Sequence, residues 1–302
     1  MPCFHPIEGY RTPSGTITFN RSQGYSDVPV TVPCGQCIGC RIARKKAWAA
    51  RCIHEAQMHD RNCFLTLTYD EENVPPFASL YRPDLVKFKK RLRERLRAKH
   101  GIKIKTFECG EYGESFDRPH YHLNVFGWDF PDKTLWKRRN DNPIFLSDLL
   151  EELWPYGYAT VGHLTYESAA YTAGYVLKKV TGKAADKHYE IMDVDTGELF
   201  RREPEYCTMS KGIGSEYYDK YKTDLYPDDF IIVKGRKHTI PKYYDNKFQA
   251  EQDDGVFINA HDRIKLRRRR AATRHKENNT PARLATREEV IKRKLTIFKR
   301  EL

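Results

Sequence analysis

Apolar and polar residues between positions 41 and 180 follow two periods, one typical of strands and one typical of helices. The segment FLTLTY at 64–69 alternates apolar and polar side chains, as a strand with one buried face does. The segment 83–101 has apolar residues three or four positions apart, as a helix with one apolar stripe does. We therefore predict strands at 63–69, 102–109, 120–127 and 158–165, and helices at 41–59, 83–101, 146–154 and 166–180.

The strands and helices from position 63 onward follow the order β-α-β-β-α-β, and one more helix comes after them. This split βαβ order predicts an α+β fold of the ferredoxin-like type, an antiparallel sheet with flanking helices. We expect this core at 61–185, between an N-terminal cysteine-containing segment and helix at 1–60 and a C-terminal extension at 186–302. In the extension, FIIVKG at 230–235 suggests a strand. The basic tail from Arg263 is predicted to be helical, either by itself or once bound to DNA.

The composition favours a soluble protein with a polyanionic partner. Of the 302 residues, 39% are hydrophobic and 31% are charged, and the formal net charge is +12. The isoelectric point near 9.2 and the mean hydropathy of −0.75 agree with nucleic acid as the partner. An anionic membrane is the competing partner, but no apolar run approaches the roughly 20 residues that a membrane span needs. Because MPCFHPIEGY lacks the charged-then-apolar order of a secretory signal, we expect a cytoplasmic location.

Three of the eight cysteines form a run with metal-ligand spacing. Two residues separate Cys34 from Cys37 and Cys37 from Cys40, which in a reducing compartment favours a metal site over disulfides. With Cys3 or His5 as the fourth ligand, the run could hold a structural zinc ion. A ferredoxin-like cluster would need another cysteine four residues later, where the chain has an arginine. The alternative is a group of reduced thiols around a tight turn.

His120 and His122 stand one residue apart in the predicted strand RPHYHLNVFG, so their imidazoles share one face of the sheet. Two imidazoles and one carboxylate can hold a divalent ion and leave positions open for phosphate oxygens and water. Glu111, across a predicted turn, is the preferred third ligand, and Glu108 is the alternative. Such a site would take Mn²⁺, which imidazole favours, or Mg²⁺, which is the more available ion. Otherwise the two histidines simply lie on a polar sheet face.

Tyr171 and Tyr175 are four residues apart in the predicted helix 166–180 and so share one helix face. Tyrosine is a covalent nucleophile when activated, and Lys178 and Lys179 follow closely. An ammonium near a phenol favours the phenolate and stabilises negative charge during phosphoryl transfer. In a chain with 19 tyrosines the spacing could also serve packing. Beside a metal-binding strand, the pair suggests phosphoryl transfer through tyrosine.

Three motifs in order resemble those of a known family. FLTLTYD, RPHYHLNVFG and YTAGYVLKK span about residues 63–180 and closely resemble the rolling-circle replication initiators of the HUH endonuclease superfamily. Within it the chain looks like the replication proteins of microviruses, small single-stranded DNA phages, and of their gokushovirus branch in particular. The N-terminal PCGQCIGCR also resembles that branch. One departure is Tyr121, where the family usually has a bulky apolar residue, and a buried tyrosine there needs a partner for its hydroxyl.

The resemblance implies an activity and partners. It implies that one tyrosine attacks single-stranded origin DNA to form a 5′-phosphotyrosine link, while His120, His122 and an acidic residue hold the metal that polarises the phosphate. The freed 3′-hydroxyl would prime a host polymerase, with a host helicase as a further partner. The second tyrosine would cut the regenerated origin, and strand transfer would close the displaced circle. Thr66 and Thr68 would support the site, and the protein would act in the cytoplasm of a bacterial host without a membrane partner.

Dense runs of basic residues are candidate DNA contacts. Such runs usually follow a phosphate backbone and bind it more weakly as salt rises, although a solvated helix face is the alternative. Tyr217, Tyr218 and Tyr221 could stack on unpaired bases. Besides the RIKLRRRR tail, the candidate DNA-contacting residues are Lys89, Lys90, Arg93, Arg118 and Lys179.

The residues and the resemblance together predict a replication initiator, a site-specific single-stranded DNA endonuclease and strand transferase. The enzymatic alternative is a transposase or relaxase with the same chemistry. An alternative from another class is a non-catalytic, zinc-stabilised DNA-binding protein whose histidines and tyrosines only pack.

Overall fold

A computed structural model describes most of the chain, and the described residues divide into two compact units. One unit combines Met1–Arg44 with Lys247–Leu302, and the other is Lys45–Asn246. The predicted division into 1–60, 61–185 and 186–302 remains a prediction. The described residues are 3–113, 116–139, 141–174, 179–180, 184–193, 196–226, 228–251, 260–274 and 276–299.

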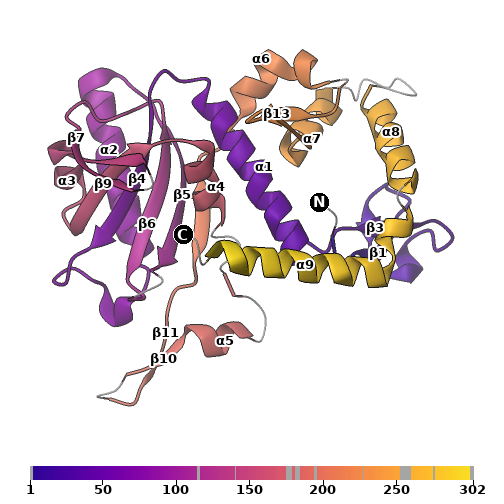
Figure 1. Ribbon diagram of the computed structural model, residues 1–302, viewed down its shortest axis with the longest axis horizontal. Coiled ribbons are helices and arrows are strands. Elements are labelled where there is room, and N and C mark those ends of the chain that lie inside the picture. Colours follow the sequence, from indigo (N-terminus) through magenta and orange to yellow (C-terminus); the bar gives the residue numbers. More distant parts are fainter. Residues whose placement is uncertain are drawn as a thin grey trace. The chain divides into compact units, whose positions relative to one another are not determined.

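The second unit is built on a sheet in which seven strands of the described chain pair in the order β12-β5-β6-β4-β9-β8-β7, every neighbour antiparallel (Figure 1). Strand β6 separates β4 from β5, and helix α2 (Arg82–His100) connects those two strands. This is the split βαβ arrangement, so the predicted α+β fold class is confirmed. The strands are β4 (Asn62–Tyr69), β5 (Lys105–Tyr112), β6 (Pro119–Phe126), β7 (Thr134–Arg139), β8 (Asn142–Leu146), β9 (Gly157–His163) and β12 (Tyr206–Met209).

Helices cover both faces of this sheet. Helices α2 and α3 (Asp148–Leu153) pack on one face, where Leu92 and Leu150 join the buried side chains Leu65 and Leu123. On the other face, α1 (Ile38–Ala56) and α4 (Tyr166–Gly174) pack through small residues against Phe107 and Phe126. Figure 1 shows α2 and α3 on one side of the sheet and α4 on the other. The central strands β5 and β6 are therefore buried at almost every position.

Three strands of the sheet were not predicted. All six residues of β7 are exposed, so its sequence TLWKRR has no alternation of apolar and polar positions. Strand β8 includes Pro143, and β12 is only four residues long. Hydrophobic periodicity finds strands with one buried face, and these three segments have too few buried side chains to produce it.

Short elements connect this sheet to the rest of its unit. Ile231–Val233, within the predicted strand 230–235, is β13 and pairs with β14. The other elements of this part of the chain are α5 (Ala184–Tyr189), β10 (Glu190–Met192), β11 (Leu199–Arg201), α6 (Ser215–Leu225), β14 (Arg236–His238) and α7 (Lys242–Glu251), whose last residues belong to the first unit.

The first unit contains both ends of the described chain. Its strands pair antiparallel in the order β2-β1-β3, and the basic tail is helical, as predicted. Among described residues, no helix combines the length and the low charge that crossing a bilayer requires. The elements are β1 (Ile7–Arg11), β2 (Ile17–Thr18), β3 (Pro29–Val32), α8 (Ala260–Arg274) and α9 (Pro281–Lys299).

The hydroxyl of Tyr121, on the α2 face of β6, has the partners that a buried tyrosine needs. Its Oη accepts from the Tyr81 amide at 3.0 Å, donates to the Tyr81 carbonyl at 2.9 Å and lies 3.1 Å from Tyr69 Oη. Burial raises the pKa of Tyr121 to about 12, so the hydroxyl keeps its proton. Tyr121 therefore connects the start of α2 to strand β6 through hydrogen bonds.

We expect Tyr121→Phe to lower the free energy of unfolding by about 1–3 kcal/mol, because the Tyr81 amide loses its acceptor and the Tyr81 carbonyl loses one of its donors. Urea denaturation measures this change. The matched control is Tyr158→Phe, whose ring is 68% exposed on β9 and whose effect should stay within about 0.5 kcal/mol. Equal midpoints for the two variants would contradict the role given to the Tyr121 hydroxyl.

Candidate metal centre and active site

Strands β5 and β6 bring His120, His122 and Glu111 together on the sheet face covered by α1 and α4. In the antiparallel register Glu111 lies opposite His120, and Cys109 lies opposite His122. Glu111 Oε1 is 2.7 Å from His120 Nε2 and 3.1 Å from His122 Nε2. The side chains of Glu111 and His122 are 1% and 7% exposed, whereas that of His120 is 16% exposed. The cluster therefore opens to solvent on the His120 side.

The Nδ1 atoms of both imidazoles, which point away from Glu111, contact neighbouring groups. His120 Nδ1 donates to the Arg118 carbonyl at 3.1 Å, and His122 Nδ1 is 3.1 Å from Thr66 Oγ1 on β4. The ring of Phe64 stacks on His122 at 5.3 Å between centroids. Hydrogen bonds of this kind fix the ring orientation of metal-binding histidines and direct Nε2 at the ion. Thr66 thus has a contact that suits the supporting role expected of it.

Glu111 is the anionic member of the cluster. Burial by itself would raise the pKa of Glu111, but the hydrogen bonds from His120 and His122 outweigh burial and lower it to about 2. The carboxylate is therefore ionised at every physiological pH. A buried anion between two imidazoles is the charge distribution that a divalent cation needs.

The spacing of the three residues fits a small divalent ion. Their ligand atoms all lie within 4.8 Å of one another. Two ligands at right angles and about 2.1 Å from an octahedral ion lie about 3.0 Å apart, close to the observed nitrogen–oxygen distances of 2.7 and 3.1 Å. The set combines imidazole with carboxylate, and so suits Mn²⁺ or Mg²⁺ with open positions for oxygen ligands.

The alternative carboxylate, Glu108, lies on the other face of the sheet. It is opposite Leu123 in the register, forms an ion pair with Lys89 of α2 and accepts a hydrogen bond from Thr208 Oγ1 at 2.7 Å. Of the two acidic residues considered from the sequence, Glu111 is the one placed beside the histidines.

Helix α4 places Tyr171 at the same cluster. Its Oη donates to Glu111 Oε1 at 3.2 Å, and its ring meets the edge of His122 with 5.0 Å between centroids. The side chain is 47% exposed, so a large substrate can reach it. Tyr175 and Lys178 lie outside the described residues, and Lys179 is exposed.

The position of α4 is fixed at its start and along its buried side. Thr165 and Ser168 exchange hydrogen bonds between side chain and backbone at 2.8 and 3.2 Å, the reciprocal arrangement that begins a helix. Asn124 Nδ2 donates to Thr172 Oγ1 at 3.0 Å and ties the helix to β6. Asn124 was not predicted as a site residue, although it continues the polar alternation of His120 and His122.

The predicted DNA-contacting residues do not lie together. Lys89, Lys90 and Arg93 belong to α2, on the sheet face opposite the histidines, where they line a groove of about 720 Å³ with Arg97 and Lys103. Arg118 precedes β6 and donates to the Tyr69 carbonyl at 3.0 Å.

The four cysteines singled out from the sequence cluster in the first unit. The ligand atoms of Cys3, Cys34, Cys37 and Cys40 lie within 4.8 Å of one another, and the amides of Phe4, Cys34 and Cys37 donate to their sulfurs at 3.2–3.3 Å.

These contacts favour a thiolate at Cys37. Burial would raise the pKa of the Cys37 thiol, but hydrogen bonds from the Phe4 amide and its neighbours lower it to about 6. Four sulfurs at this spacing fit a tetrahedral zinc ion, and a thiolate at neutral pH is the form that binds it. His5, the alternative fourth ligand, instead pairs with Glu288 of α9 at 2.8 Å. Leu284 of α9 packs against Phe4 and Cys37.

Comparison with known proteins identifies the family. Residues 62–180 match the family model described as replication-associated protein ORF2/G2P. The chain is 33% identical, over 91% of its own length and 88% of the relative's, to replication-associated protein ORF2 of Spiroplasma virus 4. The chain belongs to the family of phage replication-associated proteins.

Other members of this family are also similar to the chain. Replication-associated protein VP4 of Bdellovibrio phage phiMH2K is 28% identical over 84% of the chain and 79% of the relative. Replication-associated protein ORF4 of Chlamydia phage 1 is 32% identical over 70% of the chain and 52% of the relative. No solved structure matches the chain. The predicted resemblance to phage replication proteins is confirmed, and the matched segment 62–180 contains the histidines, Glu111 and both tyrosines.

Proposed function

We propose that this replication-associated protein is a metal-dependent single-stranded DNA endonuclease and strand transferase of the HUH type, which initiates rolling-circle replication. The observation that carries the proposal is the hydrogen bond from Tyr171 Oη to the carboxylate that also contacts both histidines. This contact supports Tyr171 as the nucleophile, because its phenol oxygen lies beside a cluster fit for a divalent ion. A phosphodiester bound to such an ion would have its phosphorus within reach of the phenol oxygen.

The reaction is a transesterification, in which one phosphorus–oxygen bond forms and one breaks. The oxygen of Tyr171 bonds to phosphorus, the bond from phosphorus to the 3′ oxygen breaks, and the 3′ oxygen takes up a proton as the phenol gives one up. The products are a 5′-phosphotyrosine and a free 3′-hydroxyl. Mn²⁺ or Mg²⁺ held by His120, His122 and Glu111 would supply a positive charge that stabilises the phosphate in the transition state. Attack by a 3′-hydroxyl on the phosphotyrosine reverses the step and joins strands.

The same reaction gives roles to the other residues predicted from the sequence. Tyr175 would be the second nucleophile, and Lys178 would stabilise the phenolate. Basic residues of α2 and the tail would hold flanking DNA. The released 3′-hydroxyl would be extended by a host polymerase behind a host helicase, in the cytoplasm of the bacterial host. The names of the relatives refer to replication, which favours an initiator over a transposase or relaxase.

The test uses labelled single-stranded oligonucleotides that tile both strands of the genome encoding the chain, incubated with the protein and Mn²⁺. We expect one oligonucleotide to form a denaturation-resistant protein–DNA adduct, and the Tyr171→Phe, Tyr175→Phe double variant to form none. Tyr166→Phe, in the same helix, is the matched control and should keep the wild-type rate. Binding without adduct under Mn²⁺ and Mg²⁺ would leave only a non-catalytic DNA-binding protein and so overturn the proposal.

A further inference from the structure

Lys45 lies on α1 where this helix packs against the tyrosine-bearing helix α4. One turn further along α1, Ala49 and Cys52 are fully buried with Ala169 and Ala173 of α4. Small residues of the two helices therefore share one buried cluster. Because Lys45 precedes Ala49 by one turn, its side chain emerges at the same helix–helix contact.

The Lys45 side chain extends across Gly174, the last residue of α4. A Cβ atom placed on Gly174 would lie 3.2 Å from Lys45 Nζ and 3.4 Å from Cε. Gly174 follows Tyr171 by three residues, so the two are neighbours on the helix surface. The absence of a side chain at Gly174 therefore lets an ammonium group reach the helix end beyond Tyr171.

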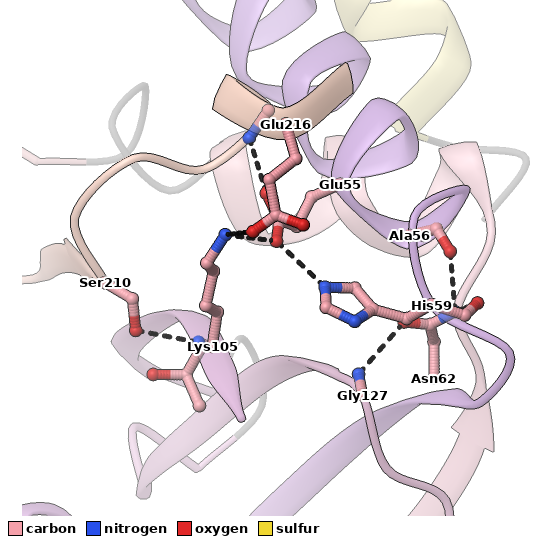
Figure 2. A network of polar contacts seen from close by, with 10 residues as sticks. Glu55, Ala56, His59, Asn62, Lys105, Gly127, Ser210 and Glu216 are labelled. Atoms are coloured by element: carbon pink, nitrogen blue, oxygen red, sulfur yellow. Dashed lines mark hydrogen bonds and ion pairs between the residues drawn. The ribbon is translucent and has the colours of Figure 1, made fainter. Parts of the chain in front are cut away.

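No anion accompanies this ammonium in the described part of the chain: Lys45 Nζ has no hydrogen bond or ion pair there. Other partly buried lysines of the unit differ. Lys105 Nζ is 2.8 Å from both Glu55 and Glu216 (Figure 2). Lys89 pairs with Glu108. Burial lowers the pKa of Lys45, with no carboxylate to oppose the effect.

A half-buried ammonium without an anionic partner destabilises the fold. Binding of an anionic ligand would offset this destabilisation. The ligand that would satisfy it is an anion that arrives at the end of α4. We propose that Lys45 binds a phosphate group of the DNA strand that lies on the tyrosine-bearing helix. This inference rests on the proposed function, and it adds a phosphate contact from α1, outside the segment that contains the histidines and tyrosines.

The test compares Lys45→Met and Lys45→Arg with Lys46→Met, in which the neighbouring, exposed lysine of the same helix is changed. We expect Lys45→Met to lower the single-turnover rate of adduct formation, or the affinity for the reactive oligonucleotide, at least about 10-fold, as loss of a charged hydrogen bond does. Lys45→Arg should retain most of both. The salt dependence of binding should weaken by about 0.7 in log–log slope for Lys45→Met, the contribution of one phosphate contact on single-stranded DNA.

A purely structural role predicts a different pattern. Removal of an unpartnered cation should leave the melting temperature of Lys45→Met equal to or above that of the wild type, whereas loss of helix packing would lower it. The inference is overturned if Lys45→Met matches Lys46→Met within twofold in rate, affinity and salt slope, or if Lys45→Arg is no better than Lys45→Met. If the wild type forms no adduct, the proposed function fails, but the affinities and salt slopes measured on single-stranded DNA still decide whether Lys45 contacts phosphate.

Discussion

Glu111→Gln should reduce both the affinity for Mn²⁺ and the rate of adduct formation at least about 100-fold. Changing a residue that only hydrogen-bonds to a metal ligand typically costs about 10–100-fold, and loss of a ligand should cost more. The amide has nearly the shape of the carboxylate but no charge, so two neutral imidazoles would face the cation without an anion. The low pKa of Glu111, about 2, means that the wild type supplies this charge across the usable pH range. Calorimetric titration with Mn²⁺ and single-turnover kinetics measure the two effects.

Glu108→Gln is the matched control, because it makes the same change on the same strand but on the opposite face of the sheet. It breaks the ion pair with Lys89 and should lower the melting temperature while leaving Mn²⁺ affinity unchanged. Wild-type Mn²⁺ affinity in Glu111→Gln would refute the ligand assignment. Loss of Mn²⁺ binding in Glu108→Gln alone would transfer the role to that residue.

Cys37→Ser should lose the zinc that we propose for the cysteine cluster and release helix α9 from it. A structural zinc site supplies folding free energy directly, about 10 kcal/mol or more in small zinc domains. Cys37 also packs against Leu284 of α9. We therefore expect the bound zinc to fall by one equivalent per chain and protease cleavage within Pro281–Lys299 to accelerate at least about 10-fold.

Cys207→Ser, in β12 of the other unit, is the control for the cysteine variant and should keep its zinc. Elemental analysis and timed proteolysis of the full chain give both readouts. Wild-type protein that binds no zinc, or Cys37→Ser that retains it, would contradict the assignment and leave a group of reduced thiols.

The choice between Glu111 and Glu108 illustrates what a sequence can and cannot predict about this site. Alternation within β6 is enough to place His120 and His122 on one face, since successive side chains in a strand point in opposite directions. Which face of β5 joins them depends on the pairing register, and a shift by one residue would bring Glu108 to the histidines instead of Glu111. The register is fixed by the turn between the strands, which the sequence pattern does not specify.

The same distinction applies to the fold. The core strands and α2 were predictable because apolar side chains recur on at least one face of each. Strand β7 was not, because it is held by backbone pairing to β8 while its side chains are exposed. Lys45 was not singled out either, since its importance comes from the contact with Gly174, which is 129 positions away in the sequence.

The pairing of His5 with Glu288 has a consequence for how the protein is made. The two residues are 283 positions apart, and they lie in a unit formed from segments on either side of the sheet unit. During translation all the strands of the large sheet have left the ribosome once Met209 has emerged, whereas α9 is synthesised some 70 residues later. The four cysteines, all within the first 40 residues, are available from the outset. The order of synthesis therefore makes the four cysteines available to a metal ion before the C-terminal helix that completes their unit has been made.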